Sequence, residues 1–150
     1  MLKITLMHVG SRAAAKDGYE VLLHGYLERC SGFARCGVEA FRSEDALLNR
    51  AAARKGRSKP ELVLLDSRGR RMSSDEFAAW LGARRDQGVQ EIAFAIGPAD
   101  GWTDAARKQA AMVLSLGPMT MAHGLARLVM AEQLYRAVTI LTGHPYHRGH

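Results

Sequence analysis

Apolar and polar positions change their spacing repeatedly along this chain. Over residues 2–9 they alternate, which is typical of a strand, and over residues 17–28 apolar residues recur at helical spacing. The runs ELVLLD at 61–66 and EIAFAI at 91–96 are continuous and apolar, as in strands buried on both faces of a sheet. The pattern predicts five strands, at residues 2–9, 38–41, 61–66, 91–96 and 112–116.

Helix-starting residues stand between these strands. Ser43 is a candidate N-cap for a helix to about Lys55, and Ser73 with Glu76 forms a capping box for a helix through about Arg85. Thr103 opens a further helix, and a long apolar helix is expected over 125–141. GRSKP at 56–60 and SRGRRM at 67–72 are predicted turns. Strand and helix therefore alternate, which predicts a single α/β domain with a parallel sheet and helices on both faces.

Composition narrows the class of protein. The 150 residues are 47% hydrophobic and 24% charged, which is normal for one globular domain. No apolar run approaches the roughly 18 residues of a membrane span, and the first ten residues do not form a signal peptide. Cys30 and Cys36 have a spacing that fits no common zinc or redox motif. A cytoplasmic protein with reduced thiols, no metal and no membrane contact is expected.

The positive net charge and the clustering of basic residues favour binding to a polyanion. The net charge is +6 and the sequence pI is about 9.7. Basic residues are clustered at Arg50, Arg54, Lys55, Arg57 and Lys59, at Arg68, Arg70 and Arg71, and at Arg84 and Arg85. Such a surface attracts nucleic acid, although a basic face that only keeps the protein in solution gives the same count.

Three glycine-containing segments follow strands, at the sheet edge where α/β proteins bind ligands. They are LLDSRG at 64–69, AIGPADG at 95–101 and SLGPMTMAHG at 115–124. None has the glycine spacing of a dinucleotide or triphosphate loop. The last is unusually apolar for a loop, so either a neighbouring loop covers it or it forms a slot for a flat ring such as adenine.

The chain ends with GHPYHRGH at 143–150, which holds three of the six histidines. The preceding helix is apolar most of the way round, which favours burial against a partner subunit. For the tail itself the residues leave four interpretations open: a disordered end, a metal-binding tract, a purification remnant or part of a working site.

Several of these segments together resemble the RlmH-type methyltransferases, small ribosomal RNA enzymes of the SPOUT class. The resemblance is carried by residues 114–123, RLVMAEQLYRA at 127–137 and HPYHR at 144–148, with further similarity in LLDSRGRRMSSDEFA at 64–78. It implies a C-terminal trefoil knot, a homodimer, bound S-adenosylmethionine, and methylation of N3 of a pseudouridine in a 23S rRNA stem-loop on the assembled ribosome. DNA is not an implied partner.

The resemblance also implies roles for individual residues. Cofactor contacts fall on Leu65, Gly97, Pro98, Gly117, Pro118, Met119, Thr120, Met121 and Ala122. Pro98, Ala122 and Gly117 depart from the family, which usually has glycine, proline and often serine at these positions.

The target imide nitrogen must lose a proton, so the site needs a base or a cation that stabilises the anion. Catalytic roles are expected for Tyr146, which would stack on the base, His147 as the candidate proton acceptor, and Arg148 and Arg136 as anion-stabilising groups. RNA contacts are expected from His123, Arg127 and His144. A knotted tRNA methyltransferase and a ribosome-binding module with weakened cofactor binding remain the alternatives.

Overall fold

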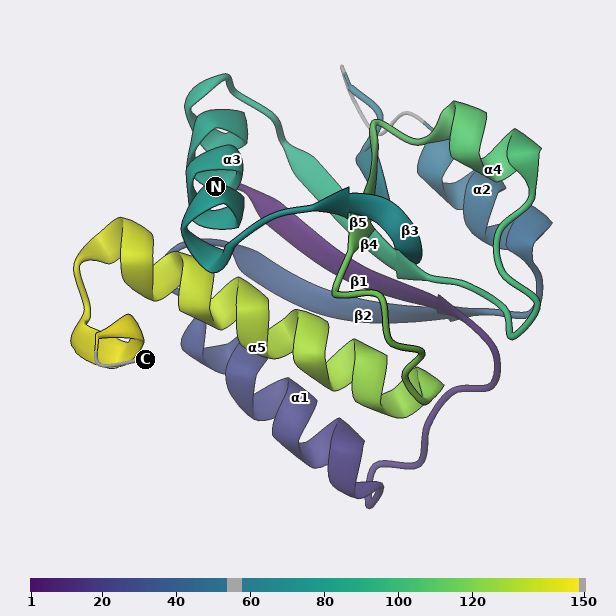
Figure 1. The fold of residues 1–150 in the computed structure, drawn as a ribbon, viewed down its shortest axis with the longest axis horizontal. Helices are drawn as coiled ribbons and strands as arrows, with labels where there is room; N and C mark the ends of the chain where they lie inside the picture. The colour runs from purple at the N-terminus through teal and green to yellow at the C-terminus, as the bar shows by residue number, and fades with distance from the viewer. Residues whose placement is uncertain (54–57, 149–150) are drawn as a thin grey trace.

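The structure, a computed structural model, describes residues 1–53 and 58–148, and its centre is a five-stranded parallel sheet (Figure 1). The order across the sheet is β2-β1-β4-β3-β5. The strands are β1 (Lys3–Val9), β2 (Arg35–Phe41), β3 (Glu61–Arg71), β4 (Glu91–Ile96) and β5 (Met112–Ser115). The helices are α1 (Gly18–Arg29), α2 (Glu44–Ala52), α3 (Ser74–Asp86), α4 (Asp104–Gln109), α5 (His123–Thr142) and the short 3-10 helix η1 (Pro145–His147).

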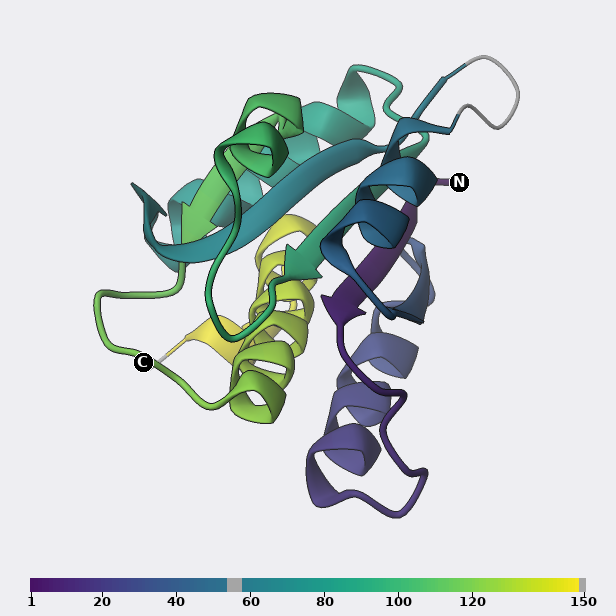
Figure 2. The same ribbon diagram turned by 90° about the vertical axis from the view of Figure 1, so that its right-hand side faces the viewer.

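Helices cover both faces of the sheet, which confirms the predicted α/β architecture. One core joins the sheet to α1, α3 and α5, and its centre includes Leu23, Phe94 and Leu134. A smaller core joins the other face to α2 and α4 through Leu47 and Ala106. Figure 2 shows α1 and α5 together on one side of the sheet, with α2 and α4 on the opposite side.

The most informative difference from the sequence prediction lies in β3. The predicted turn at 67–72 is wrong, because the strand continues through most of it to Arg71. β3 pairs with β5 at Val63–Leu65 and again at Arg70–Arg71, with a register shift between the two stretches. Gly69 permits this second pairing, since a Cβ there would lie 2.7 Å from the Val113 carbonyl oxygen. The segment is therefore a bulged strand, and its pairing partner is more than 40 residues away in sequence.

Other boundaries moved by a few residues. β2 begins at Arg35 instead of residue 38, and α5 begins at His123 instead of residue 125. The capping box of Ser73 and Glu76 is confirmed. α2 ends at Ala52, earlier than expected; Lys55 itself and the closing Gly149–His150 lie outside the described residues.

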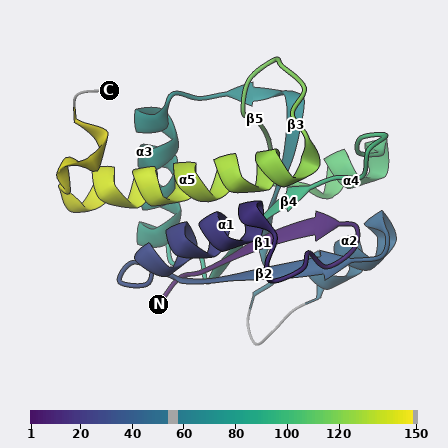
Figure 3. The same cartoon turned by 90° about the horizontal axis from the view of Figure 1, so that it is seen from below.

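A buried ion pair fixes α1 against α5, which lie side by side (Figure 3). The Arg127 guanidinium donates to both carboxylate oxygens of Glu20, at 2.7 and 3.3 Å. Arg127 is only 3% exposed and Glu20 7%, so neither charge has much access to water. The hydrogen bond from Arg127 lowers the pKa of Glu20 despite burial, which acts in the opposite direction.

Glu20→Gln is expected to destabilise the fold, because it leaves the Arg127 charge buried without its counter-ion. Breaking one partner of a buried pair costs about 3–5 kcal/mol, which urea unfolding at neutral pH would measure. Glu28→Gln, on the exposed side of the same helix, is the matched control. Equal unfolding midpoints for wild type and Glu20→Gln would contradict the assignment.

The same pair predicts a pH dependence. Because the pKa of Glu20 is lowered in the folded state, its contribution is present above the ordinary carboxyl pKa and is lost as the pH falls through the lower folded value. The difference in unfolding free energy between wild type and Glu20→Gln should therefore shrink in acid.

Candidate functional site

The three strand-end segments singled out in the sequence meet around one cavity of about 540 Å³. The first lies in the bulged part of β3 and the other two follow β4 and β5, at one edge of the parallel sheet. The lining residues are Leu65–Arg68, Ile96–Trp102, Leu116, Gly117, Met119–Met121, His123 and Ala126.

Most of the expected cofactor contacts border this cavity. Those that line it are Leu65, Gly97, Pro98, Gly117, Met119, Thr120 and Met121. Pro118 and Ala122 belong to the same loop but do not line the cavity. Met119 is 80% exposed, so no neighbouring loop covers this apolar side chain. That exposure favours the slot interpretation of the loop over the packing alternative.

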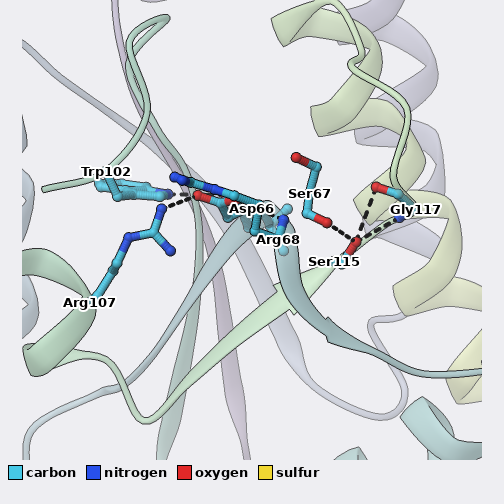
Figure 4. A network of polar contacts seen from close by, with 8 residues as sticks. Asp66, Ser67, Arg68, Trp102, Arg107, Ser115 and Gly117 are labelled. Carbon is cyan, nitrogen blue, oxygen red and sulfur yellow. Dashed lines mark hydrogen bonds and ion pairs between the residues drawn. The ribbon is translucent and has the colours of Figure 1, made fainter. Parts of the chain in front are cut away.

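Trp102 is a structural element of the site that sequence reasoning missed. Its indole Nε1 donates to the Leu65 carbonyl oxygen at 3.0 Å and so ties the loop after β4 to the end of β3 (Figure 4). A Cβ at Gly97 would lie 2.7 Å from the Trp102 ring. Gly97 is therefore required by close packing, and the only hint in the sequence is a large aromatic at the end of a glycine-containing loop.

Ser115, also missed, fixes the third loop (Figure 4). Its buried hydroxyl lies 3.0 Å from the Ser67 carbonyl oxygen and 3.1 Å from the Gly117 carbonyl oxygen, and it accepts a hydrogen bond from the Gly117 N–H. Gly117 has a φ of +130°, a conformation that favours glycine. The hydroxyl thus holds the β3 bulge against the loop that precedes α5.

Asp66 supplies a fixed negative charge at the cavity edge. Burial raises its pKa, but hydrogen bonds from the Arg68 backbone N–H and from the Arg107 guanidinium outweigh burial and lower the pKa. The carboxylate therefore stays ionised near neutral pH and anchors α4 to the end of β3 (Figure 4).

His123 reaches the cavity from the first turn of α5 and packs edge-on against His8, with ring centroids 5.4 Å apart. Burial lowers the pKa of both imidazoles, and the neighbouring Arg127 charge acts in the same direction. His123 is therefore neutral near pH 7 and can accept a hydrogen bond from a ligand. The RNA contact expected of Arg127 does not fit its position, because its guanidinium is buried against Glu20.

The tail packs as a folded turn against the C-terminal half of α5. The Tyr146 hydroxyl donates to Glu132 at 3.0 Å, and the Tyr146 ring lies 4.7 Å from the Tyr135 ring. Burial, followed by the Glu132 hydrogen bond, raises the pKa of Tyr146 to about 12, so the phenol stays protonated. His144 caps the turn by accepting from the Tyr146 N–H at 3.2 Å. Residues 144–148 are thus not a disordered end.

Two further expected catalytic residues, Arg136 on α5 and His147 in η1, contact each other. Arg136 donates to the Glu132 carboxylate at 3.0 Å and to Nδ1 of His147 at 3.0 Å. Because Nδ1 accepts this bond, the proton of neutral His147 lies on Nε2, which faces Asp75 at 3.5 Å. Arg148 is exposed at the end of the turn.

Within one chain the described part of the tail, residues 143–148, does not line the cavity. Tyr146 contacts residues 132–136, which lie nine to thirteen positions after His123 on α5. At 1.5 Å per residue this is roughly 13–20 Å along the helix. Figure 3 shows the tail and the first turn of α5 at opposite ends of that helix.

Residues 1–53 and 58–148 lack two features, a candidate membrane-spanning helix and a candidate metal-binding cluster. None of their helices combines the length and the apolarity that a membrane crossing needs. These residues also contain no cluster of three or more histidine, cysteine, aspartate or glutamate side chains placed to hold a metal ion.

The sequence is similar to a known protein family and to named proteins. The family model described as a predicted SPOUT methyltransferase matches residues 2–147. A ribosomal RNA large subunit methyltransferase H of Koribacter versatilis (strain Ellin345) is 47% identical over 149 residues, which cover 99% of this chain and 100% of the relative. The protein with the same name from Rhizobium meliloti (strain 1021) is 43% identical over 165 residues, covering 98% and 99% of the two chains.

A solved structure shares the fold. The probable methylase family protein from Haemophilus influenzae Rd KW20 aligns with a TM-score of 0.53 at 11% sequence identity, covering 99% of this chain and 70% of that one. At this identity the likeness concerns the fold alone. From the family match and the near full-length relatives it follows that the chain belongs to the SPOUT methyltransferase family.

Proposed function

We propose that the protein transfers a methyl group from S-adenosylmethionine to N3 of a pseudouridine in a 23S rRNA stem-loop on the assembled ribosome. The observation that carries this proposal is the cavity at the ends of β3, β4 and β5, found in a chain of this family. The names of the relatives support ribosomal RNA as the substrate. Because the proposed substrate is the ribosome, the proposed compartment is the cytoplasm.

The cavity fits the cofactor in size and chemistry. Its volume of about 540 Å³ is within the range of small-molecule sites. Gly97 and Gly117 leave backbone groups open to the edge of an adenine ring, and the thioethers of Met119 and Met121 can flank its faces. When bound, S-adenosylmethionine supplies an electrophilic methyl group carried by a sulfonium.

The chain's own residues would prepare the target nitrogen. Arg136 and Arg148 would stabilise the imide anion by charge-assisted hydrogen bonds. His147 is the proposed proton acceptor, and it must release Arg136 before its Nδ1 lone pair can act. Tyr146 would stack on or position the base, since its phenol holds its proton at neutral pH. His123 and His144 are proposed RNA contacts.

The separation of tail and cavity supports a homodimer in which residues 143–150 of one protomer complete the cavity of the other. Apolar side chains left exposed on α1 and α5 favour such a partner, with Val21 58%, Leu22 57% and Leu125 37% exposed. The whole chain would then be one SPOUT domain that carries half of each active site. The trefoil knot belongs to the same proposal and is supported by the match to the SPOUT family.

The basic surface supports RNA as the macromolecular partner. Arg68, Arg70 and Arg71 are exposed on the C-terminal part of β3, and Arg68 lines the cavity. Their spacing along an extended strand suits a phosphate backbone.

A methylation assay offering intact ribosomes, free ribosomal RNA and bulk transfer RNA tests the substrate. Mass spectrometry should find one methylated pseudouridine in the large-subunit RNA, formed from ribosomes in preference to free RNA. Methylation of transfer RNA alone would favour the knotted tRNA enzyme. Calorimetry that shows no heat with S-adenosylmethionine would favour a ribosome-binding module.

Gly97→Ala is predicted to weaken cofactor binding at least about tenfold, equivalent to about 1.4 kcal/mol. The new Cβ would push the Trp102 ring, which is held by Leu65, and so deform two walls of the cavity. Gly32→Ala is the matched control, because nothing lies within 4 Å of its added Cβ. Titration calorimetry with S-adenosylmethionine measures both, and equal affinities would remove Gly97 from the binding site.

Tyr146→Ala and Arg148→Ala are each predicted to abolish methyl transfer while cofactor affinity stays within about twofold of wild type. The reason is that these side chains are proposed to act on the RNA base and its anion, whereas the cavity proposed to hold the cofactor is lined by other residues. Single-turnover assays on ribosomes and calorimetry on the same samples separate the two effects. Normal turnover in both variants would exclude the tail from the active site.

A further inference from the structure

A second cavity, of about 390 Å³, lies beside the first. It is formed by the end of β3, the start of α3, β5 and the middle of α5. Leu116 and Gly117 line both cavities, so the two are neighbours across a shared wall. No part of the proposed cofactor site accounts for this space.

The β3 bulge positions the wall that the two cavities share. Residues Leu65–Arg68 border the first cavity, and Arg71–Ser74 border the second. Between these segments the Ser115 hydroxyl holds the Ser67 carbonyl and the Gly117 backbone together (Figure 4). The same bulged strand therefore shapes both cavities and separates them.

The lining of the second cavity combines an apolar surface with hydrogen-bonding groups. Phe77, Leu114 and Met130 are buried residues that provide the apolar wall. The polar side is formed by Ser74 and Gln133, whose side chains are hydrogen-bonded to each other at 2.8 Å. The Gln133 amide donates one hydrogen to Glu132, which leaves its second hydrogen for another acceptor.

A cation stands at the edge of this cavity. Arg71 lines it and is exposed, and Arg70 beside it is exposed as well. An apolar wall, an amide donor and a guanidinium within one small cavity match the three parts of a nucleotide, namely the face of the base, its polar edge and the phosphate. The volume is near the lower limit for ligand sites, which fits one nucleotide and excludes a duplex.

Side-chain contacts link the second cavity to the tail of its own chain. Gln133 bonds Glu132, and Glu132 in turn accepts hydrogen bonds from Tyr146 and Arg136. On the other side, Asp75, adjacent to Ser74, faces His147. A ligand in this space would therefore lie between the cofactor cavity and the tail.

We propose that the second cavity binds one unstacked nucleotide of the RNA strand, a neighbour of the nucleotide that is methylated. The inference rests on the proposed function and adds a position at which the protein holds the strand. Single-stranded RNA loops are recognised by bases that leave the stack and enter such pockets. Because the two cavities share a wall, consecutive nucleotides can approach both together.

Val129→Phe tests this cavity, because Val129 lines it from α5 and the larger ring fills it. Methylation of ribosomes should show a KM raised about tenfold, as expected for the loss of one stacked base, with unchanged affinity for S-adenosylmethionine. Ala79→Phe, on an exposed position of α3, is the control for adding a ring. An unchanged KM overturns the proposal, and so does an altered sedimentation coefficient, which would make this face a subunit contact.

A direct binding measurement separates this inference from the proposed function. Titration of the wild-type protein with uridine 5′-monophosphate should shift the NMR signals of the Ser74 amide and the Gln133 side-chain amide, and Val129→Phe should abolish these shifts. Inorganic phosphate alone should leave the Gln133 side chain unaffected. Absence of shifts at both residues overturns the inference even if the enzyme methylates ribosomes, whereas failure of methylation with these shifts present overturns only the proposed function.

If Val129→Phe does not fold, Arg71→Gln serves in its place, because Arg71 is an exposed side chain at the edge of the cavity. Its affinity for ribosomes should fall and depend less steeply on salt, since one phosphate contact is lost. An unaltered salt dependence overturns the proposed phosphate position.

Discussion

β3 pairs with β5 on both sides of a bulge, and the rest of the site depends on this double pairing. Gly69 lets the strand approach the β5 backbone, and the Ser115 hydroxyl bonds the bulge to the loop before α5. These two short-range contacts hold loops that are about 50 residues apart in sequence. Without them the end of β3 would be a free turn, and neither cavity would have its common wall.

Two ion pairs, one buried and one partly buried, provide the second constraint on the shape of the site. The Glu20–Arg127 pair fixes the first half of α5 against α1, and the Asp66–Arg107 pair fixes α4 against the end of β3. Arg127 is next in sequence to the cavity residue Ala126, and Asp66 lines the cavity itself, so both ion pairs hold segments that form its walls. Burial lowers the pKa of His123, and the nearby Arg127 charge acts in the same direction, which leaves the imidazole able to accept a hydrogen bond.

The sequence predicts those parts of the fold that depend on residues close to one another in the chain. The apolar runs at 61–66 and 91–96 and the capping box at Ser73 lie where strands and a helix are found, because burial and capping act over a few residues. The continuation of β3 was not predictable in the same way, since SRGRR has turn composition and only pairing with a distant strand makes it extended. Tertiary pairing overrides local propensity there.

The candidate site likewise combines residues that the local sequence predicts with residues that only tertiary contacts reveal. The apolar loop before α5 and the glycines at strand ends marked most of the cavity, because those residues are unusual where they stand. Trp102 and Ser115 were missed, since their roles depend on contacts to Leu65 and Ser67 that no local pattern reveals. Arg127 was expected to contact RNA, because the sequence near it does not reveal its ion-pair partner Glu20, 107 residues earlier.

The proposed homodimer requires that the tail of one protomer completes the cavity of the other. Heterodimers that combine a Gly97→Ala chain with a Tyr146→Ala chain test it most directly. One of their two sites would pair an intact cavity with an intact tail, so methylation of ribosomes should recover to about half of the wild-type rate per dimer, while each variant homodimer stays inactive or weak. Heterodimers no more active than the two homodimers would contradict the account.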